Sequence, residues 1–135
     1  MNIDDKYVFA IQGRTIIPSI SSQIAVATDI NSRRIVFKIP MYIDGYNVKD
    51  SIISVRCVNA AKKFSQYVLT EREIRSGDAN TYIYAEWVMG ADVTSTSGQV
   101  IYDITITDDT QSSYAWHTLP ASFMVEAGIQ IPENN

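Results

Sequence analysis

The sequence predicts an all-β protein: a single antiparallel β-sandwich, immunoglobulin-like or jelly-roll-like, with about 7–8 strands. Three observations support this class. Apolar and polar residues alternate with a period of two through most of the chain. The alternating segments are rich in β-branched and aromatic residues and are bounded by clusters of Gly, Pro, Asn, Asp and Ser. They recur about every 8–12 residues, a spacing typical of sandwiches rather than of alternating strands and helices.

The predicted strands share this alternation and cover residues 24–26, 34–39, 52–58, 64–69, 81–89, 99–107, 114–118 and 122–126. The second of them is the clearest, because Ile35, Phe37 and Ile39 fall on one face of the strand. Pro40 then ends it, since proline has no N–H to donate to a sheet. The Asp44-Gly45 dipeptide that follows is a strong turn signal.

Residues 70–76 are the one segment with a helical pattern, and Gly77 is a stop signal after it. The segment is short and has a single apolar residue, so a turn within a loop is an equal alternative. Residues 1–128 are expected to form the sandwich domain. Residues 129–135 are polar and include Pro132, which predicts a flexible tail.

Composition excludes several classes of function. The 135-residue chain has 11 Lys and Arg against 15 Asp and Glu, a net charge of −4, which argues against nonspecific binding to nucleic acid. No apolar run approaches the roughly 18 residues of a membrane helix. Asp4 and Asp5 lie where a signal peptide would be basic. Synthesis in the cytoplasm without a signal peptide is therefore expected.

Residues capable of catalysis or metal binding are few. The single cysteine, Cys57, lies in a predicted strand and is interpreted as a small apolar core residue. The single histidine, His117, could act as the general base of a hydrolase, but the sequence has no Gly-X-Ser-X-Gly motif for the nucleophile. His117 is therefore interpreted as a half-exposed strand residue. One His and one Cys cannot complete a structural zinc site. The chain is therefore predicted to have no catalytic residue, cofactor or metal, and not to be an enzyme.

Carboxylates and aromatic residues leave two alternatives open. Asp103, Asp108 and Asp109 could bind calcium, although an ordinary turn explains the last two more simply. Trp87 is interpreted as a core residue. Several tyrosines are candidates for sugar stacking or for a protein interface, because an exposed aromatic ring supplies a large contact area. These candidates are Tyr42, Tyr46 and Tyr114.

Two segments together resemble one protein family. Residues 22–26 and 29–45, with the run Asn-Ser-Arg-Arg-Ile-Val-Phe-Lys-Ile-Pro followed by Asp-Gly, form the first. The run Tyr-Ala-Trp-His-Thr-Leu-Pro-Ala-Ser-Phe-Met-Val-Glu at residues 114–126 forms the second. Both resemble the N-terminal domain of phage baseplate upper proteins, from phages and prophages of Gram-positive bacteria. The resemblance extends from about Tyr7 to Glu126 and implies a β-sandwich.

This resemblance implies a structural role in the virion tail or baseplate. The domain would dock to other tail proteins, support receptor-binding components and belong to a homo-oligomer, a trimer, without binding nucleic acid or inserting into a membrane. Longer family members continue into a helical stalk, and this chain contains no heptad segment. The interaction surface is expected to include Arg33, Arg34, Tyr42, Asp44, Tyr46 and Tyr114. The alternative is a carbohydrate-binding module that recognises host cell-wall saccharide through exposed aromatic rings.

Overall fold

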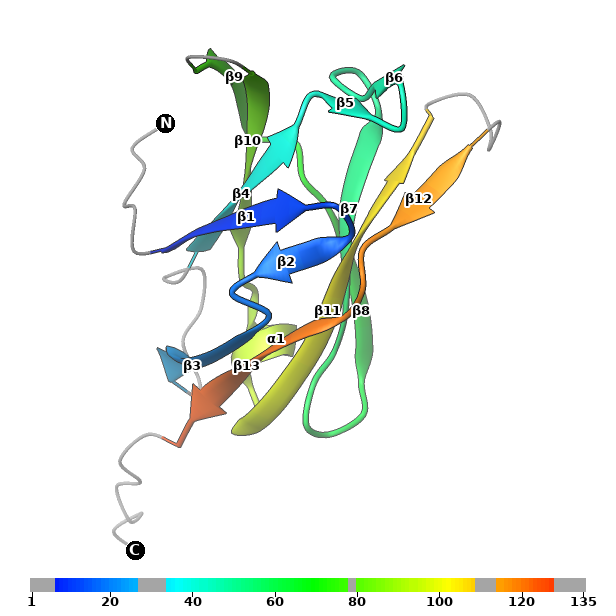
Figure 1. Ribbon diagram of the computed structural model, residues 1–135. Helices are drawn as coiled ribbons and strands as arrows, with labels where there is room; N and C mark the ends of the chain where they lie inside the picture. The colour runs from blue at the N-terminus through cyan, green and yellow to red at the C-terminus, as the bar shows by residue number, and fades with distance from the viewer. Residues whose placement is uncertain (1–6, 27–33, 78–79, 109–113, 128–135) are drawn as a thin grey trace, which may run out of the picture.

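The computed structural model describes residues 7–26, 34–77, 80–108 and 114–127, and within residues 21–26 only the backbone (Figure 1). The described chain consists of β-strands with one short helix, as the sequence predicts. The expected tail at residues 129–135 lies outside the described residues. In the part that is described, no helix is long and apolar enough to cross a membrane.

One sheet has five strands in the order β2-β1-β4-β10-β9. Its strands are β1 (Val8–Gln12), β2 (Thr15–Ile17), β4 (Arg34–Pro40), β9 (Arg72–Ser76) and β10 (Thr81–Val88). Neighbouring strands are antiparallel except β1 and β4, which run parallel. The predicted strand end at Pro40 is confirmed, because it is the last residue of β4.

The second sheet has six strands. Five lie in the order β3-β13-β11-β7-β8, and β12 also pairs with β11. They are β3 (Ile20–Val26), β7 (Ile52–Val58), β8 (Phe64–Val68), β11 (Gly98–Thr107), β12 (Ala115–His117) and β13 (Ala121–Glu126). The pairing of β13 with β3 is parallel and the others are antiparallel.

Two small elements connect these sheets. The strands β5 (Tyr42–Ile43) and β6 (Tyr46–Asn47) form a separate two-stranded hairpin beside the end of β4 (Figure 1). The helix α1 (Ala91–Thr94) lies between β10 and β11. It packs inward through Val93 and Thr94, and the Asn59 side-chain amide donates a hydrogen bond to the Asp92 carbonyl at 3.0 Å.

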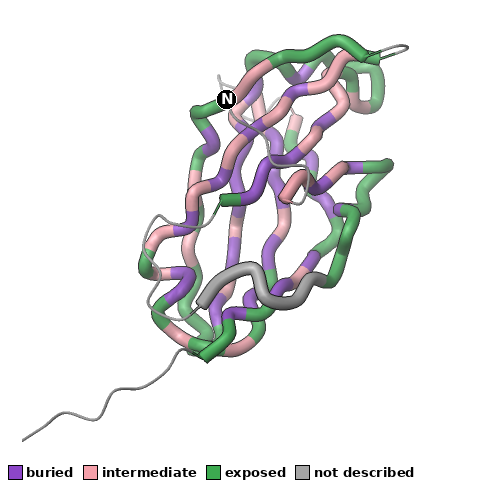
Figure 2. The backbone as a smooth tube through the Cα atoms, turned by 90° about the vertical axis from the view of Figure 1, so that its left-hand side faces the viewer, coloured by how far each residue is buried: buried purple, intermediate pink, exposed green. Residues whose placement is uncertain are grey.

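The core lies between the inward faces of the two large sheets. Buried residues alternate with more exposed ones along the strands (Figure 2). Trp87 of β10 is 1% exposed and packs against Tyr102 and Phe123 of the other sheet, with ring centroids 5.6 and 5.9 Å away. The interpretations of Trp87 and Cys57 as core residues are therefore confirmed.

The predicted strand count is too low. The described part of the chain has about thirteen strands in three sheets instead of 7–8 strands, and two of the described pairings are parallel. The missed strands include β1 and the very short β2, β5 and β6, which are too brief to show a clear alternation. The helical pattern at residues 70–76 is also misleading. Residues 72–76 form β9 instead, because pairing with β10 gives their backbone groups partners and places Ile74 opposite Ile83.

Candidate functional site

The β5–β6 hairpin projects two exposed aromatic rings. Tyr42 and Tyr46 are 60% and 55% exposed. Between them Asp44 and Gly45 have φ angles of 50° and 85°, the left-handed pair that a tight two-residue hairpin requires. The predicted Asp-Gly turn is therefore confirmed. A backbone hydrogen bond from the Val48 N–H to the Met41 carbonyl, at 2.8 Å, closes the base of the hairpin. The two tyrosines are thus presented by a short, fixed turn.

Tyr114 comes from the opposite end of the sequence and joins this hairpin. Its ring stacks on Tyr46, with centroids 4.8 Å apart and planes inclined by 16°. The hydroxyl groups of Tyr114 and Ser51 share a hydrogen bond of 2.6 Å. The Ser51 carbonyl in turn accepts a hydrogen bond from the Arg72 guanidinium at 2.8 Å. Four of the predicted site residues, Tyr42, Asp44, Tyr46 and Tyr114, therefore lie at one end of the molecule.

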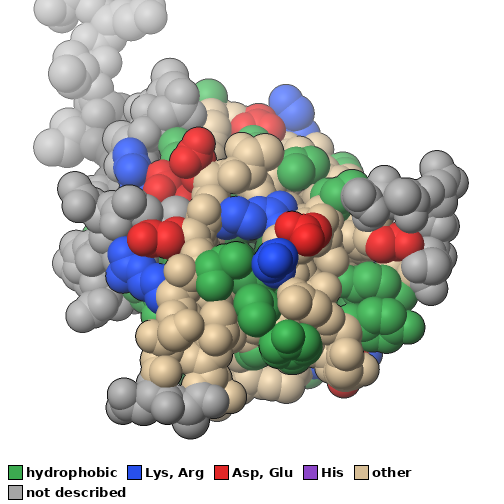
Figure 3. All heavy atoms as spheres, turned by 90° about the horizontal axis from the view of Figure 1, so that it is seen from above, with side chains coloured by type: hydrophobic (Ala, Val, Ile, Leu, Met, Phe, Trp, Pro, Cys, Tyr) green, Lys and Arg blue, Asp and Glu red, His purple; other side chains and the backbone are tan. Residues whose placement is uncertain are grey.

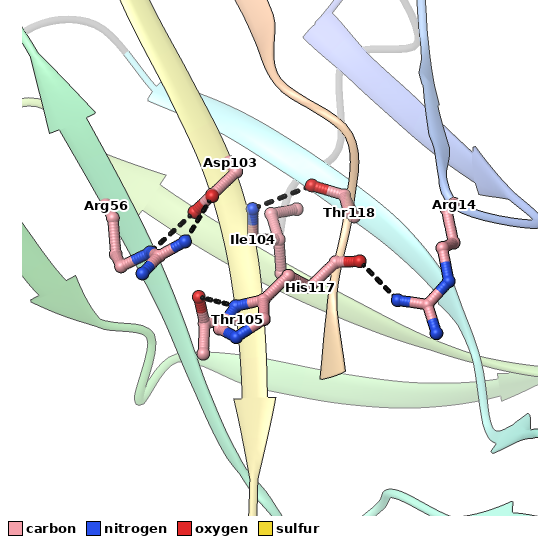
Figure 4. A network of polar contacts seen from close by, with 7 residues as sticks. All are labelled: Arg14, Arg56, Asp103, Ile104, Thr105, His117 and Thr118. Atoms are coloured by element: carbon pink, nitrogen blue, oxygen red, sulfur yellow. Dashed lines mark hydrogen bonds and ion pairs between the residues drawn. The ribbon is translucent and has the colours of Figure 1, made fainter. Parts of the chain in front are cut away.

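A hollow of about 210 Å³ lies beside the hairpin. It is lined by Gly13, Arg14, Pro40, Tyr42, Ile43, Asp44 and Trp116. The Arg14 guanidinium carbon lies 5.1 Å from the Trp116 ring centroid, a cation–π arrangement. The same guanidinium donates a hydrogen bond to the His117 carbonyl at 2.8 Å (Figure 4). The hollow thus combines a positioned cation, a carboxylate and aromatic walls.

This end of the molecule has a mixed surface. Seen from above, hydrophobic side chains lie next to clusters of Lys and Arg and of Asp and Glu (Figure 3). One charged residue at this end is tied into the fold. Arg72 donates hydrogen bonds to carbonyls of the neighbouring loops, and burial lowers its pKa. The surface at this end of the molecule therefore mixes apolar and charged side chains.

Arg34 is not part of this site. It begins β4, whereas Tyr42 follows the last residue of that strand, so the two residues lie at opposite ends of a seven-residue strand. The Arg34 guanidinium forms an ion pair with Glu86 at 3.0 Å. The expectation that Arg34 and the tyrosines share one surface is not supported by this placement. Arg33, the remaining predicted site residue, lies outside the described residues.

The residues considered for catalysis and metal binding are placed as follows. His117 is exposed on β12, and its Nδ1 atom shares a 2.9 Å hydrogen bond with the Thr105 hydroxyl (Figure 4). Arg56 holds Asp103 through two hydrogen bonds of 2.9 and 2.5 Å, and this pairing raises the pKa of Arg56. Among the described residues no three His, Cys, Asp or Glu side chains group as metal ligands, and Asp109 falls outside that set.

Two half-buried tyrosines of β10, Tyr82 and Tyr84, lie against cations. Lys38 Nζ lies 4.3 Å from the Tyr82 ring centroid, and the Arg75 guanidinium carbon lies 5.3 Å from that of Tyr84. Both rings belong to the outer face of β10 and are half-buried. Their surface is thus partly occupied within the chain, which distinguishes them from Tyr42 and Tyr46.

Sequence reasoning missed two residues of the hollow, Arg14 and Trp116, as site residues. Arg14 follows Gly13 in the turn between β1 and β2, strands that the alternation pattern did not predict. A Gly-Arg pair between two short apolar runs was the available signal. Trp116 is 5% exposed and reads as a core residue, and only the folded chain shows that its ring forms one wall of the hollow.

Comparison of the sequence with models of known protein families and with curated proteins finds no match.

Proposed function

We propose that this protein is a non-enzymatic docking domain that joins neighbouring subunits of a phage or prophage tail. The domain would be an immunoglobulin-like or jelly-roll-like sandwich in the baseplate, where it supports receptor-binding components. One observation carries the proposal: Tyr42 and Tyr46, both more than half exposed, are presented by a closed two-residue hairpin turn. Exposed aromatic rings on a fixed backbone are the residues that most often dominate protein interfaces.

The phage context rests on the sequence resemblance, and the arrangement of the two resembling segments supports it. The first segment supplies Pro40, Tyr42 and Asp44 to the hollow, and the second supplies Trp116. The second also supplies Tyr114, which stacks on Tyr46. Segments far apart in the sequence thus build one end of the molecule together. A docking surface made from both segments explains why the two patterns occur in the same chain.

The experiment is a binding assay between the full chain and tail proteins of the same phage, with surface variants of the chain. Tyr42→Ala is the main variant, because Tyr42 lines the hollow and is 60% exposed. An aromatic interface anchor typically contributes 2 kcal/mol or more, so we expect the dissociation constant to rise by roughly thirtyfold. Met124→Ala, a change of a 37% exposed residue on β13, is the matched control. Equal affinities for wild type and Tyr42→Ala would refute the surface assignment.

A second candidate function, recognition of host cell-wall saccharide, is favoured by the hollow itself. Arg14, Asp44 and the Tyr42 ring offer hydrogen-bonding groups beside an aromatic face, the combination that small-molecule sites use. The volume of about 210 Å³ is below the roughly 300–1,000 Å³ of drug-sized sites, which suits one sugar ring.

Calorimetric titration with wall polysaccharide distinguishes the two functions. Saturable binding that Arg14→Ala and Asp44→Asn abolish, while Arg75→Ala preserves it, would favour the saccharide-binding candidate. Absence of binding in wild type, together with tail-protein binding that depends on Tyr42, would favour the docking domain. We expect no hydrolysis of wall glycans or esters in either case.

A further inference from the structure

Strand β8 forms one edge of the six-stranded sheet and, among the described strands, pairs only with β7. Two hydrogen bonds next to the strand show which residues bond to β7. The Leu69 N–H donates to the Ile53 carbonyl at 2.8 Å, and the Asn59 N–H donates to the Lys63 carbonyl at 3.1 Å. In an antiparallel ladder the bonded residues alternate. The backbone N–H and C=O groups of Phe64, Gln66 and Val68 therefore point away from β7, toward the free edge.

This edge has none of the usual protection against pairing. Natural edge strands carry charges, proline or bulges, or are very short. Strand β9, the edge of the other sheet, has the sequence Arg-Glu-Ile-Arg-Ser, and β2 has three residues followed by Pro18. Strand β8 reads Phe-Ser-Gln-Tyr-Val, is uncharged, and pairs with β7 in unbroken register. Its Phe64 and Val68 side chains are 59% and 55% exposed.

We propose that β8 pairs antiparallel with β8 of a second copy of this chain, about a two-fold axis at Gln66. In that register Gln66 faces its own counterpart, and Phe64 faces Val68 of the second copy. All three residues are the ones whose backbone groups face the free edge, so each pair exchanges both of its hydrogen bonds. The two exposed apolar side chains at the ends of the strand then cover each other across the interface.

Lys63 precedes the strand, and the register places it opposite Leu69 of the second copy. Beyond Leu69 the chain leaves this sheet, because the Glu71 carbonyl accepts a hydrogen bond from the Glu86 N–H of β10 at 2.9 Å. The contact between the two copies is therefore limited to β8 itself.

The contact is small, so a concentration-dependent dimer is expected. A five-residue strand pair with two apolar contacts at its ends is smaller than standard stable interfaces, which bury about 1,200–2,000 Å². Two copies joined in this way form one continuous sheet. An isologous contact of this kind closes after two subunits, so it differs from any contact that would build a trimer.

The test is sedimentation velocity of the full chain from low to high micromolar concentration. We expect wild type to approach twice its mass of 15.1 kDa. Gln66→Pro removes an N–H that β7 does not use, so it should weaken dimerisation at least tenfold while far-UV circular dichroism stays unchanged. Gln66→Thr keeps that N–H and is the matched control. A wild type that is monomeric throughout, or a Gln66→Pro variant that still associates, would overturn the proposal.

Discussion

Replacement of Gly98 by alanine tests whether the start of β11 requires glycine. Gly98 has φ of +125°, a conformation that side chains rarely adopt. A Cβ atom built at this position would lie 2.7 Å from the Cβ of Ala60, in the turn between β7 and β8. Gly98→Ala should therefore lower the free energy of unfolding for two reasons: the strained backbone conformation and the close contact with the Ala60 Cβ.

Both penalties can be given a size. A residue held in a sparsely populated backbone region costs about 1–3 kcal/mol, and overpacking costs about 1–3 kcal/mol. Their sum is centred near 4 kcal/mol. With an unfolding entropy of about 2.1 cal/mol/K for each of the 135 residues, this corresponds to a fall in Tm of roughly 14 °C. Gly45→Ala is the control, because Gly45 has φ of +85° but nothing within 4 Å of the built Cβ. It should lower Tm by only about 4–7 °C.

The assay is thermal unfolding followed by circular dichroism, on both single variants and on the double variant Ala60→Gly/Gly98→Ala. The double variant relieves the contact but not the backbone penalty, so it should recover about half of the loss. Equal Tm values for Gly98→Ala and Gly45→Ala would show that the Ala60 contact contributes nothing. A double variant no more stable than Gly98→Ala would refute the division into two penalties.

Three further predictions concern buried or half-buried groups. Burial, together with the nearby Asp92 carboxylate, raises the pKa of Cys57 to about 12, so its thiol should resist alkylation at pH 8 and react only after unfolding, as mass spectrometry would show. Burial raises the pKa of Asp92, but the Tyr67 hydroxyl and other partners outweigh it and lower the pKa overall. The ionised Asp92 carboxylate therefore contributes its full share to the free energy of unfolding above pH 3.8, the ordinary pKa, and this share is lost as the pH falls through the lowered pKa. Asp92→Asn should remove this acid sensitivity, as urea titrations at several pH values would show. No described side chain or backbone group accepts a hydrogen bond from the buried Tyr102 hydroxyl, so Tyr102→Phe should keep or raise the free energy of unfolding, by up to about 1 kcal/mol; a clear loss would indicate a missed partner.

The fold class was predictable because local alternation records which side of a strand is buried. Ile83, Ala85 and Trp87 are each buried, as their spacing predicts. The number of strands was not predictable in the same way. Short strands such as β5 become strands only through their partners, and the charged residues of β9 resemble a helical turn until β10 supplies a ladder. Tertiary pairing decided these cases.

The candidate site was predictable only in part for the same reason. Tyr42 and Tyr46 were recognisable because the Asp44-Gly45 turn between them is a local signal. The stacking of Tyr114 on Tyr46 joins residues far apart in the sequence and depends on how the sheets meet. Arg14 belongs to the hollow for the same non-local reason, since only folding brings it against Trp116.

The place of β13 within its sheet has a consequence for synthesis of the chain. Strand β3 is made early, yet its described pairing is with β13, one of the last elements to be made. Translation proceeds at about 5–20 residues per second, so β3 waits several seconds or longer on the ribosome for its partner. During this interval one side of β11 is also without β13. The nascent chain is therefore most exposed to faulty association just before residues 121–126 emerge.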